Sequence, residues 1–321
     1  MKTKKYERGL DAKLLDSLSK KEGKEGELYP LIQKVKSRED LVIQIRDNYF
    51  NVYFQGGNIA EVKSAKSVIF DRNYFRKHKE KEKEDWHTID KQKEEAKRLF
   101  VDGQFDEYID FVKENMLSYW ENVLDNKGIA EQTAQHKICL SNTDNDEYTI
   151  LDLEYQVSKK SKFKYKGKRE TKKGGLPTPR FDIIAVRNCD HKLCVIELKK
   201  GSKALKDPSG VQEHAESYAN TIGFDKNTQK FFVEEMSKIL SQKKSLSLIG
   251  ERINIDTSSE PEFLFAYQYD PNDKKYPSIE KQKKLFKYYQ NKEYIDGFNY
   301  AKDKMVIWLN ENDYSLHGKG E

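Results

Sequence analysis

Two charged side chains, Glu197 and Lys199, end the apolar run 193–199. Side chains of a β-strand alternate between its two faces, so these two would share one face, with apolar side chains on the other. Asp182 is likewise the one carboxylate of the apolar run 180–188. Carboxylates among Ile, Val and Leu are costly to bury unless a metal ion or a cation compensates their charge. The three residues therefore predict a site for charged chemistry.

The connection between the two runs decides whether these groups meet. If residues 189–192 connect an antiparallel hairpin, Asp182 lies across from Lys199 and Ile184 lies across from Glu197. The three polar side chains then emerge on one face. A connection of odd length would place the two carboxylates on opposite faces. The proposed chemistry therefore predicts an even-length turn.

Two carboxylates a few ångströms apart would form a hard oxygen site suited to Mg²⁺ or Mn²⁺, ions that keep bound waters and accept phosphate oxygens. The ammonium group of Lys199 could orient the attacking water or neutralise charge that develops at phosphorus. We therefore predict metal-dependent hydrolysis of phosphodiester bonds without a protein nucleophile. The alternative is a cross-strand ion pair between Asp182 and Lys199, with Glu197 solvated at a sheet edge.

The chain of 321 residues exceeds the commonest domain size of roughly 100–150, which indicates one sizeable enzyme domain with a second module. We expect an N-terminal module at 1–125 and the catalytic domain at 126–321. Hydrophobic residues make up 36% and charged residues 35% of the chain. We see no apolar run long enough to span a membrane and no signal peptide, and three cysteines argue against a disulfide framework. We expect a cytoplasmic protein with reduced thiols.

The N-terminal module has the pattern of a three-stranded meander at about 40–63, followed by helices. Turn residues separate the β-type runs 40–46, 49–55 and 59–63. Residues 76–98 alternate Lys and Glu and predict an exposed helix or a connector. Apolar residues at helical spacing then predict a buried helix at 105–123.

The second half alternates helical and strand patterns. We expect a helix at 129–140, strands at 148–157, 180–188 and 193–199, a helix at 209–222 and a strand at 262–269. Further helices are expected at 230–240 and 279–289, and a short strand at 305–309. The fold class is therefore α/β (α+β), with a mixed β-sheet flanked by helices.

This order of elements, with Asp182 and the Glu197-Leu198-Lys199 motif on its strands, resembles the PD-(D/E)XK nuclease superfamily over roughly residues 128–270. The resemblance implies a restriction-endonuclease-like core and a role in restriction, repair or defence. It assigns Asp182 to the aspartate of the superfamily and Glu197 and Lys199 to its E-x-K. It also makes Mg²⁺ (or Mn²⁺) the expected cofactor.

The resemblance extends to the helices on either side of the sheet. Glu131, on the helix before the sheet, matches an accessory acid that could ligate the metal. Gln212 and His214, on the helix after the sheet, are candidates for the auxiliary polar residue. Two positions depart from the usual pattern: Phe181 replaces a proline, and the spacing from Gln212 to Tyr218 is two residues longer than Q-x-x-x-Y.

Each of these assignments has a structural alternative. Glu131 could decorate an exposed helical face, and His214 could be an ordinary hydrogen-bonded helix residue. Asp152 and Glu154 share a face of the strand before Asp182 and could supply another ligand, although outward-facing surface positions are the default. Three possible zinc ligands also gather near the predicted turn, without an evident fourth: Cys189, His191 and Cys194.

A basic segment provides the expected contact with nucleic acid. The net charge of +5 identifies no partner by itself, but nine basic residues and one acid lie between Lys159 and Lys173. The candidates for phosphate contact are Lys164, Lys166, Lys168, Arg169, Lys172, Lys173 and, on the strand, Arg180. DNA is favoured over RNA, and a homodimer is possible because nucleases that cut both strands are commonly dimeric. The competing hypothesis is an inactive nuclease fold that binds nucleic acid or protein.

Overall fold

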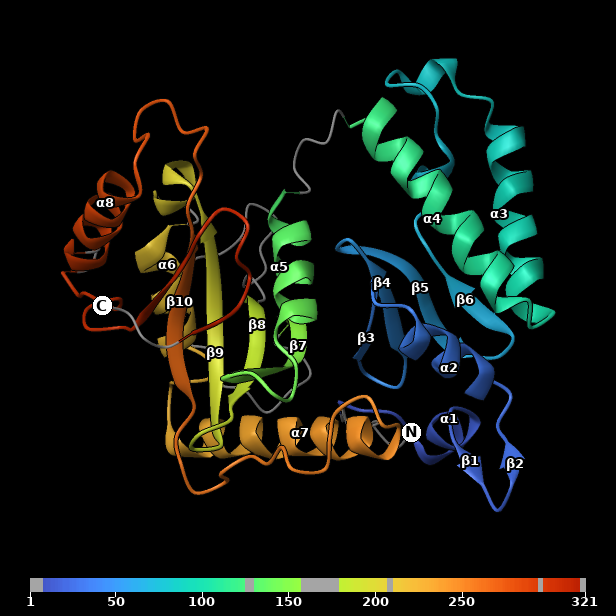
Figure 1. Cartoon of the computed structure of the whole chain (residues 1–321), viewed down its shortest axis with the longest axis horizontal. Coiled ribbons are helices and arrows are strands. Elements are labelled where there is room, and N and C mark those ends of the chain that lie inside the picture. The colour runs from blue at the N-terminus through green and yellow to red at the C-terminus, as the bar shows by residue number, and fades with distance from the viewer. Residues whose placement is uncertain (1–7, 125–129, 157–178, 207–209, 294–296, 318–321) are drawn as a thin grey trace, which may run out of the picture. The chain divides into compact units, whose positions relative to one another are not determined.

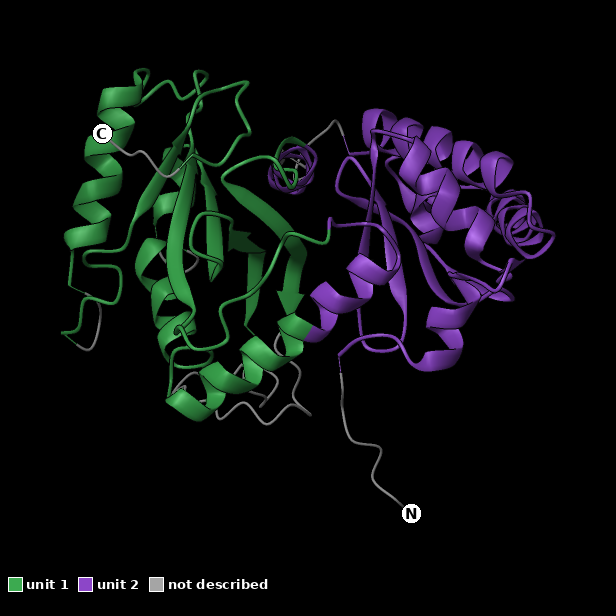
Figure 2. Ribbon diagram, turned by 60° about the horizontal axis from the view of Figure 1, so that its bottom comes forward, with its two compact units in different colours: residues 1–6, 141–237, 251–321 green, residues 7–140, 238–250 purple. Residues whose placement is uncertain are grey.

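A computed structural model describes residues 8–124, 130–156, 179–206, 210–293 and 297–317. The chain divides into two compact units (Figure 2). Unit 1 comprises residues 1–6, 141–237 and 251–321, and unit 2 comprises 7–140 and 238–250. The division thus falls after residue 140 instead of after 125, and a later segment returns to the N-terminal unit.

Unit 2 contains the expected meander with one more strand. Its four strands are antiparallel in the order β3-β4-β5-β6 (Figure 1). The predicted breaks are turns in which Asn48, Gln55 and Gly56 have positive φ. The elements of this unit before its long helices are α1 (Ala12–Ser17), β1 (Lys20–Lys21), β2 (Lys24–Glu25), α2 (Tyr29–Ser37), β3 (Leu41–Ile45), β4 (Phe50–Phe54), β5 (Gly57–Ser64) and β6 (Ser67–Ile69).

Short 3₁₀ turns, η1 (Arg72–Phe75) and η2 (Lys81–Lys83), lead to the helices α3 (Trp86–Val101) and α4 (Phe105–Asn122). Asp85 caps α3, since its carboxylate accepts hydrogen bonds from the backbone N–H groups of His87 and Thr88. One face of α4 is buried, and the Tyr108 hydroxyl donates to the carbonyl oxygen of Ile59 on β5 at 2.6 Å. The apolar spacing at 105–123 therefore marked the helix that covers the meander.

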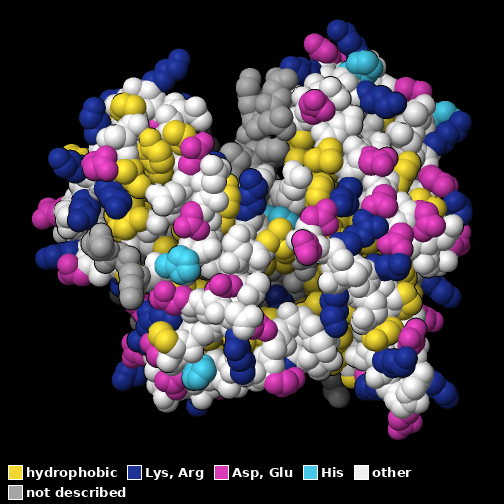
Figure 3. Space-filling view, viewed as in Figure 1, with side chains coloured by type: hydrophobic (Ala, Val, Ile, Leu, Met, Phe, Trp, Pro, Cys, Tyr) yellow, Lys and Arg dark blue, Asp and Glu magenta, His cyan; other side chains and the backbone are white. Residues whose placement is uncertain are grey.

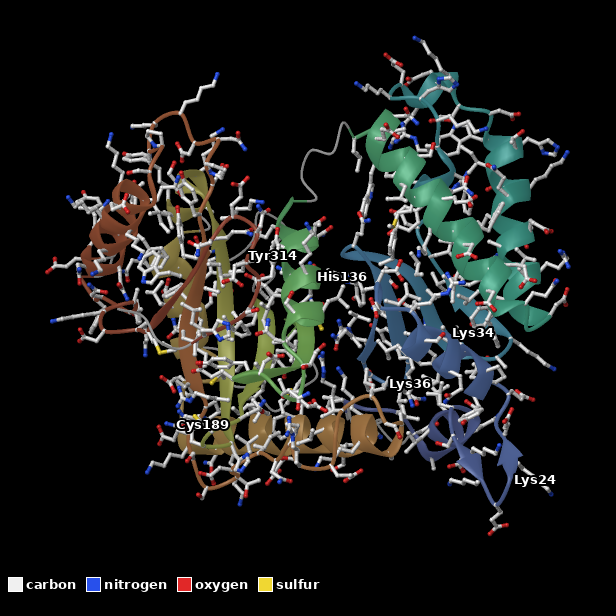
Figure 4. The ribbon with its side chains drawn as sticks, viewed as in Figure 1. Lys24, Lys34, Lys36, His136, Cys189 and Tyr314 are labelled. Carbon is white, nitrogen blue, oxygen red and sulfur yellow. The ribbon has the colours of Figure 1, made fainter. Side chains whose placement is uncertain are left out.

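Two further helical segments complete unit 2. From α5 (Ala130–Ser141), the His136 ring Nε2 lies 3.1 Å from the carbonyl oxygen of Asp40, beside β3 (Figure 4). From the last turns of α7 (Lys226–Ser245), Lys243 donates to the Gln44 side chain at 3.0 Å. The Lys243 contact joins residues 238–250 to the N-terminal unit.

Unit 1 is built on a five-stranded mixed sheet in the order β11-β10-β9-β8-β7. Strands β7, β8 and β9 form an antiparallel meander, and β10 and β11 continue the sheet in parallel. The elements are β7 (Tyr148–Gln156), β8 (Arg180–Arg187), β9 (Lys192–Lys200), η3 (Ser202–Leu205), α6 (Val211–Ala219), the first turns of α7, β10 (Glu262–Gln268), α8 (Ile279–Asn291) and β11 (Val306–Leu309). The α+β class and the mixed sheet with flanking helices are confirmed.

Aromatic side chains attach the helices to this sheet. Tyr218 of α6 stacks on Phe263 of β10 with ring centroids 4.9 Å apart. Phe232 of α7 meets Tyr155 of β7 edge to face at 5.2 Å. Phe286 of α8 packs in the same manner against residues of β10 and β11. Strands β8 and β9 are buried along almost their whole length, which explains their continuous apolar sequences.

The hairpin of β8 and β9 has the predicted parity but not the predicted pairing. Arg187 pairs with Lys192 and Ile184 with Val195, so the connection is 188–191 instead of 189–192. The predicted pair of Ile184 with Glu197 is therefore wrong by two residues. A shift of two residues keeps each side chain on its face, so the carboxylates still share one side of the sheet.

No helix in the described part of the chain has the length and apolar character needed to span a membrane.

Candidate functional site

Glu197 is the centre of the candidate site. It lies near the end of β9 between apolar neighbours and has no exposed surface. Its Oε1 accepts from the Lys199 ammonium at 2.9 Å and lies 2.5 Å from the His214 Nδ1. Its Oε2 is also buried, and no described residue donates a hydrogen bond to it. A buried carboxylate oxygen without a donor is a position where a further cation can bind.

The electrostatics keep this carboxyl group ionised. Burial by itself would raise the pKa of Glu197, but interactions with the Lys199 ammonium and the His214 ring outweigh it and lower the pKa to about 2. The site therefore holds a negative charge inside the protein at neutral pH. Lys199 is only 3% exposed, so both members of the pair are removed from water.

Asp182 lies on the same face of the sheet, at the end of the β8–β9 ladder. Ile184 and Val195 are paired, and Asp182 and Glu197 are each two residues from that pair on the same side. The Asp182 Oδ2 accepts a hydrogen bond from the backbone N–H of Leu198 at 2.8 Å. This bond fixes the Asp182 carboxylate against the strand that carries Glu197 and Lys199.

Lys199 forms an ion pair with Glu197 on its own strand, β9. The predicted alternative paired Lys199 with Asp182 across the hairpin and left Glu197 in solvent. Glu197 is instead buried, and it contacts Lys199. The part of the alternative that left Glu197 in solvent is therefore wrong.

Asp152 is a third acid on this face, and the expectation that it faces solvent is wrong. It has no exposed surface, and it pairs with Ile184, which places it on the side of Asp182. A β-bulge between Ile150 and Asp152 shifts the register of β7, and Asp152 Oδ1 accepts from the backbone N–H of Leu153 at 2.9 Å. The sequence signal was an acid flanked by leucines in an apolar run.

Of the two candidates on α6, only His214 contacts the site. Residues two apart on a helix point about 200° apart, so Gln212 and His214 cannot face the same group. The Gln212 Nε2 donates to the carbonyl oxygens of Tyr289 and Gln290 and to the Asn299 side chain, at 2.9 to 3.0 Å. Its Oε1 accepts from two backbone N–H groups of the following loop. Gln212 therefore ties α6 to α8 and is left out of the candidate site.

Two further predicted residues have exposed side chains. Glu131 is exposed on α5, within unit 2. Arg180 is exposed and forms an ion pair with Glu154 at 3.2 Å, which agrees with a role in balancing local charge. Glu154 itself has positive φ and is half-buried.

The basic segment that was expected to bind phosphates lies outside the described residues. This applies to Lys164, Lys166, Lys168, Arg169, Lys172 and Lys173.

The residues near the turn do not resemble a zinc site. Cys189 is exposed at the β8–β9 turn, at the other end of β9 from Glu197 (Figure 4). Cys194 is buried, and burial raises the pKa of its thiol to about 12 despite the nearby charge of Arg187. A zinc ligand has to be a thiolate, which this environment disfavours.

Carboxylate oxygens are the donors that a magnesium-type ion prefers. Among the described residues, no group of three or more His, Cys, Asp or Glu side chains gathers closely enough to hold a metal. Mg²⁺ does not require such a cage, because one or two carboxylates, waters and substrate phosphates commonly complete its shell. The unshared Glu197 Oε2 and the neighbouring Asp182 carboxylate are oxygen donors of this kind.

Comparisons of the chain with protein-family models, with curated proteins and with solved structures found no match.

Proposed function

We propose that unit 1 is a Mg²⁺-dependent nuclease that hydrolyses phosphodiester bonds, with DNA as the favoured substrate. The observation that carries the proposal is the ionised Glu197, fully buried, with one oxygen held by Lys199 and His214 and the other without a donor among the described residues. If the ion pair were purely structural, a buried carboxylate oxygen without a hydrogen-bond donor would only destabilise the folded protein. A bound divalent cation would remove that cost.

The roles of the residues follow from their positions. Asp182 and Glu197 would hold the metal, which when bound acts as a Lewis acid and lowers the pKa of a bound water. Lys199 supplies a fixed positive charge that can orient the attacking water or stabilise charge developing on the phosphate. His214 positions Glu197 through its 2.5 Å contact. Asp152 is a further buried acid on the same face of the sheet.

The order of elements supports the proposed superfamily. Three antiparallel strands are followed by the helices α6 and α7 and then by a parallel strand, and α5 precedes them in the chain. Apart from the added α7, this is the order that the resemblance to PD-(D/E)XK nucleases predicts, with Asp182 on the second strand and Glu197 and Lys199 on the third. The restriction-endonuclease-like fold, the role of Glu131 and a cytoplasmic setting remain part of this proposal.

The substrate assignment rests on charge. A polyanion needs basic side chains near the carboxylates, and the predicted source is the segment 159–173. Charges of both signs are interspersed on the visible face of the molecule (Figure 3). Cutting both strands of a duplex would require a second copy of the chain or a second binding event, which is why a homodimer belongs to the proposal.

A second candidate function is a binding module that retains the nuclease scaffold without turnover. It is favoured by the Lys199 and His214 contacts, which already compensate the charge of Glu197 within the protein. This function needs no metal at Asp182 and Glu197. The two candidates therefore differ in whether a divalent cation is required.

Cleavage of defined substrates tests the proposal. Single- and double-stranded DNA and RNA are incubated with the full chain in Mg²⁺, Mn²⁺ or EDTA, and with Asp182→Asn, Glu197→Gln and Lys199→Met. Asp190→Asn is the control, because Asp190 pairs with Arg187 at the far turn. We expect metal-dependent cutting that is lost in the three site variants and retained in the control. Binding without cutting in every metal would favour the module.

A further inference from the structure

The outer face of α8 combines lysines with an exposed aromatic ring. Lys281, Lys284, Lys287 and Tyr288 are exposed and recur at spacings of three, four and seven, which places them along one side of the helix. The opposite side, with Phe286, is buried against the sheet. Lysine and arginine side chains are visible over this part of unit 1, at the left of Figure 3.

Gln212 holds the segment that carries a second exposed ring, Phe298, next to the end of α8. Its Nε2 lies 3.0 Å from the carbonyl oxygen of Tyr289 and 2.9 Å from the Asn299 Oδ1. These two residues directly adjoin Tyr288 and Phe298, which are 60% and 64% exposed. Five large hydrophobic side chains are exposed in the described part of the chain, and Tyr288 and Phe298 are the aromatic members of that set.

Gln212 of α6 contacts the residues beside this surface, and His214, on the other side of the same helix, contacts Glu197. On the other side, the Tyr267 hydroxyl donates to Gln282 of α8 at 2.8 Å, and Tyr267 is the β10 partner of Lys199. α6 thus contacts β9, the strand of Glu197, and α8 packs on the neighbouring strand β10.

We infer that this surface, formed by Lys281, Lys284, Lys287, Tyr288 and Phe298, binds single-stranded nucleic acid. Exposed rings are costly in water and gain most by stacking on flat apolar groups, while lysines spaced along a helix match a chain of phosphates. Bases inside a duplex are already stacked, so rings of this kind select unpaired bases. The inference rests on the proposed nuclease function, because it names the form of nucleic acid that the site receives.

Binding measured without metal tests this inference separately from catalysis. The full chain is titrated in EDTA into a labelled oligothymidine or into a labelled duplex of equal length, and binding is measured by the fluorescence anisotropy of the label. We expect tighter binding of the single strand, and a roughly tenfold weaker single-strand affinity in the Tyr288→Ala/Phe298→Ala variant. The Tyr288→Phe/Phe298→Tyr variant keeps both rings and is expected to bind like the wild type. Lys284→Gln/Lys287→Gln should reduce the salt dependence of binding.

The controls separate failure of this inference from failure of the nuclease proposal. Val101→Ala removes an exposed apolar side chain from unit 2 and is expected to leave binding unchanged. Wild-type affinity in the Tyr288→Ala/Phe298→Ala variant, or a preference for the duplex, overturns the inference even if metal-dependent cleavage is found. Ring-dependent binding of the single strand supports it even if the chain cuts nothing.

Discussion

Breaking the buried pair of Glu197 and Lys199 should have a large effect on stability. Lys199→Met removes a cation 2.9 Å from the Glu197 Oε1 and leaves a carboxylate with no exposed surface. Removing one partner of a buried ion pair costs about 3–5 kcal/mol. We expect about 3 kcal/mol for this pair, since His214 still contacts Glu197. Glu197→Gln should also destabilise unit 1, because it removes the carboxylate that accepts from the Lys199 ammonium.

The double variant Glu197→Gln/Lys199→Met should be much less destabilised than the sum of the single variants. Replacing both charges removes the desolvation cost of each, and such exchanges are often close to neutral. We therefore expect a coupling free energy of about 2–4 kcal/mol in the double-mutant cycle. Single variants that add within about 0.5 kcal/mol would refute the buried pair.

The assay must report on unit 1 alone, because a chain of two units need not unfold in one step. Trp308 lies on β11 of this unit and packs edge to face on Tyr267 and Phe286. The other two tryptophans, Trp86 and Trp120, belong to unit 2. Urea unfolding followed by the fluorescence of Trp308, with both of the others replaced by phenylalanine, therefore measures the relevant free energy.

The pH dependence of the same quantity gives an independent check. The pKa of Glu197 is lowered from 4.5 to about 2, so its ionised form stabilises the folded state by roughly 3 kcal/mol. This contribution is fully present above pH 4.5 and is lost as the pH falls towards about 2. The stability of the wild type should thus decline through this range by more than that of Glu197→Gln. Equal slopes for the two proteins would contradict the lowered pKa.

Two further predictions concern the thiols and a tight turn. Alkylation of the native chain near pH 8 should modify the exposed Cys189 and spare Cys194, whose pKa burial raises to about 12; peptide mass spectrometry that finds both modified would contradict this. Gly56→Ala should destabilise unit 2 by about 1–3 kcal/mol more than Gly103→Ala in thermal unfolding. Both glycines have positive φ, but a Cβ at Gly56 would lie 2.5 Å from the backbone of Gln132, whereas one at Gly103 meets nothing within 4 Å. Equal losses would show that α5 does not approach this turn.

Much of the secondary structure could be predicted because each element had a strong periodic pattern. The apolar runs around Asp182 and Glu197 became β8 and β9, and the spacing at 105–123 became α4. The even parity of the hairpin also followed from the chemistry. The pairing itself did not, because shifting it by two residues leaves each side chain on its face. The turn includes His191 at positive φ and an ion pair of Arg187 with Asp190, and neither is evident from the pattern.

Other features depended on distant or irregular contacts. Asp152 was expected in solvent because polar residues usually face outwards on such a strand, but β7 is buried on both faces, and a β-bulge puts Asp152 on the face of Asp182. Gln212 looked like an auxiliary site residue, yet its partners lie between Tyr289 and Ala301, far along the chain. No local sequence pattern encodes contacts of this length. His214 could be proposed from its helix, but only the fold selects it over Gln212.

Metal binding is the most direct test of the central claim, because it does not depend on finding the substrate. Titration of the full chain with Mn²⁺, followed by electron paramagnetic resonance, compares the wild type with Asp182→Asn, Glu197→Gln and the control Asp190→Asn. We predict a bound Mn²⁺ that Mg²⁺ displaces, that both site variants lose and that the control retains. A chain that binds no Mn²⁺, or a bound ion that survives both site substitutions, would contradict a metal site at Asp182 and Glu197.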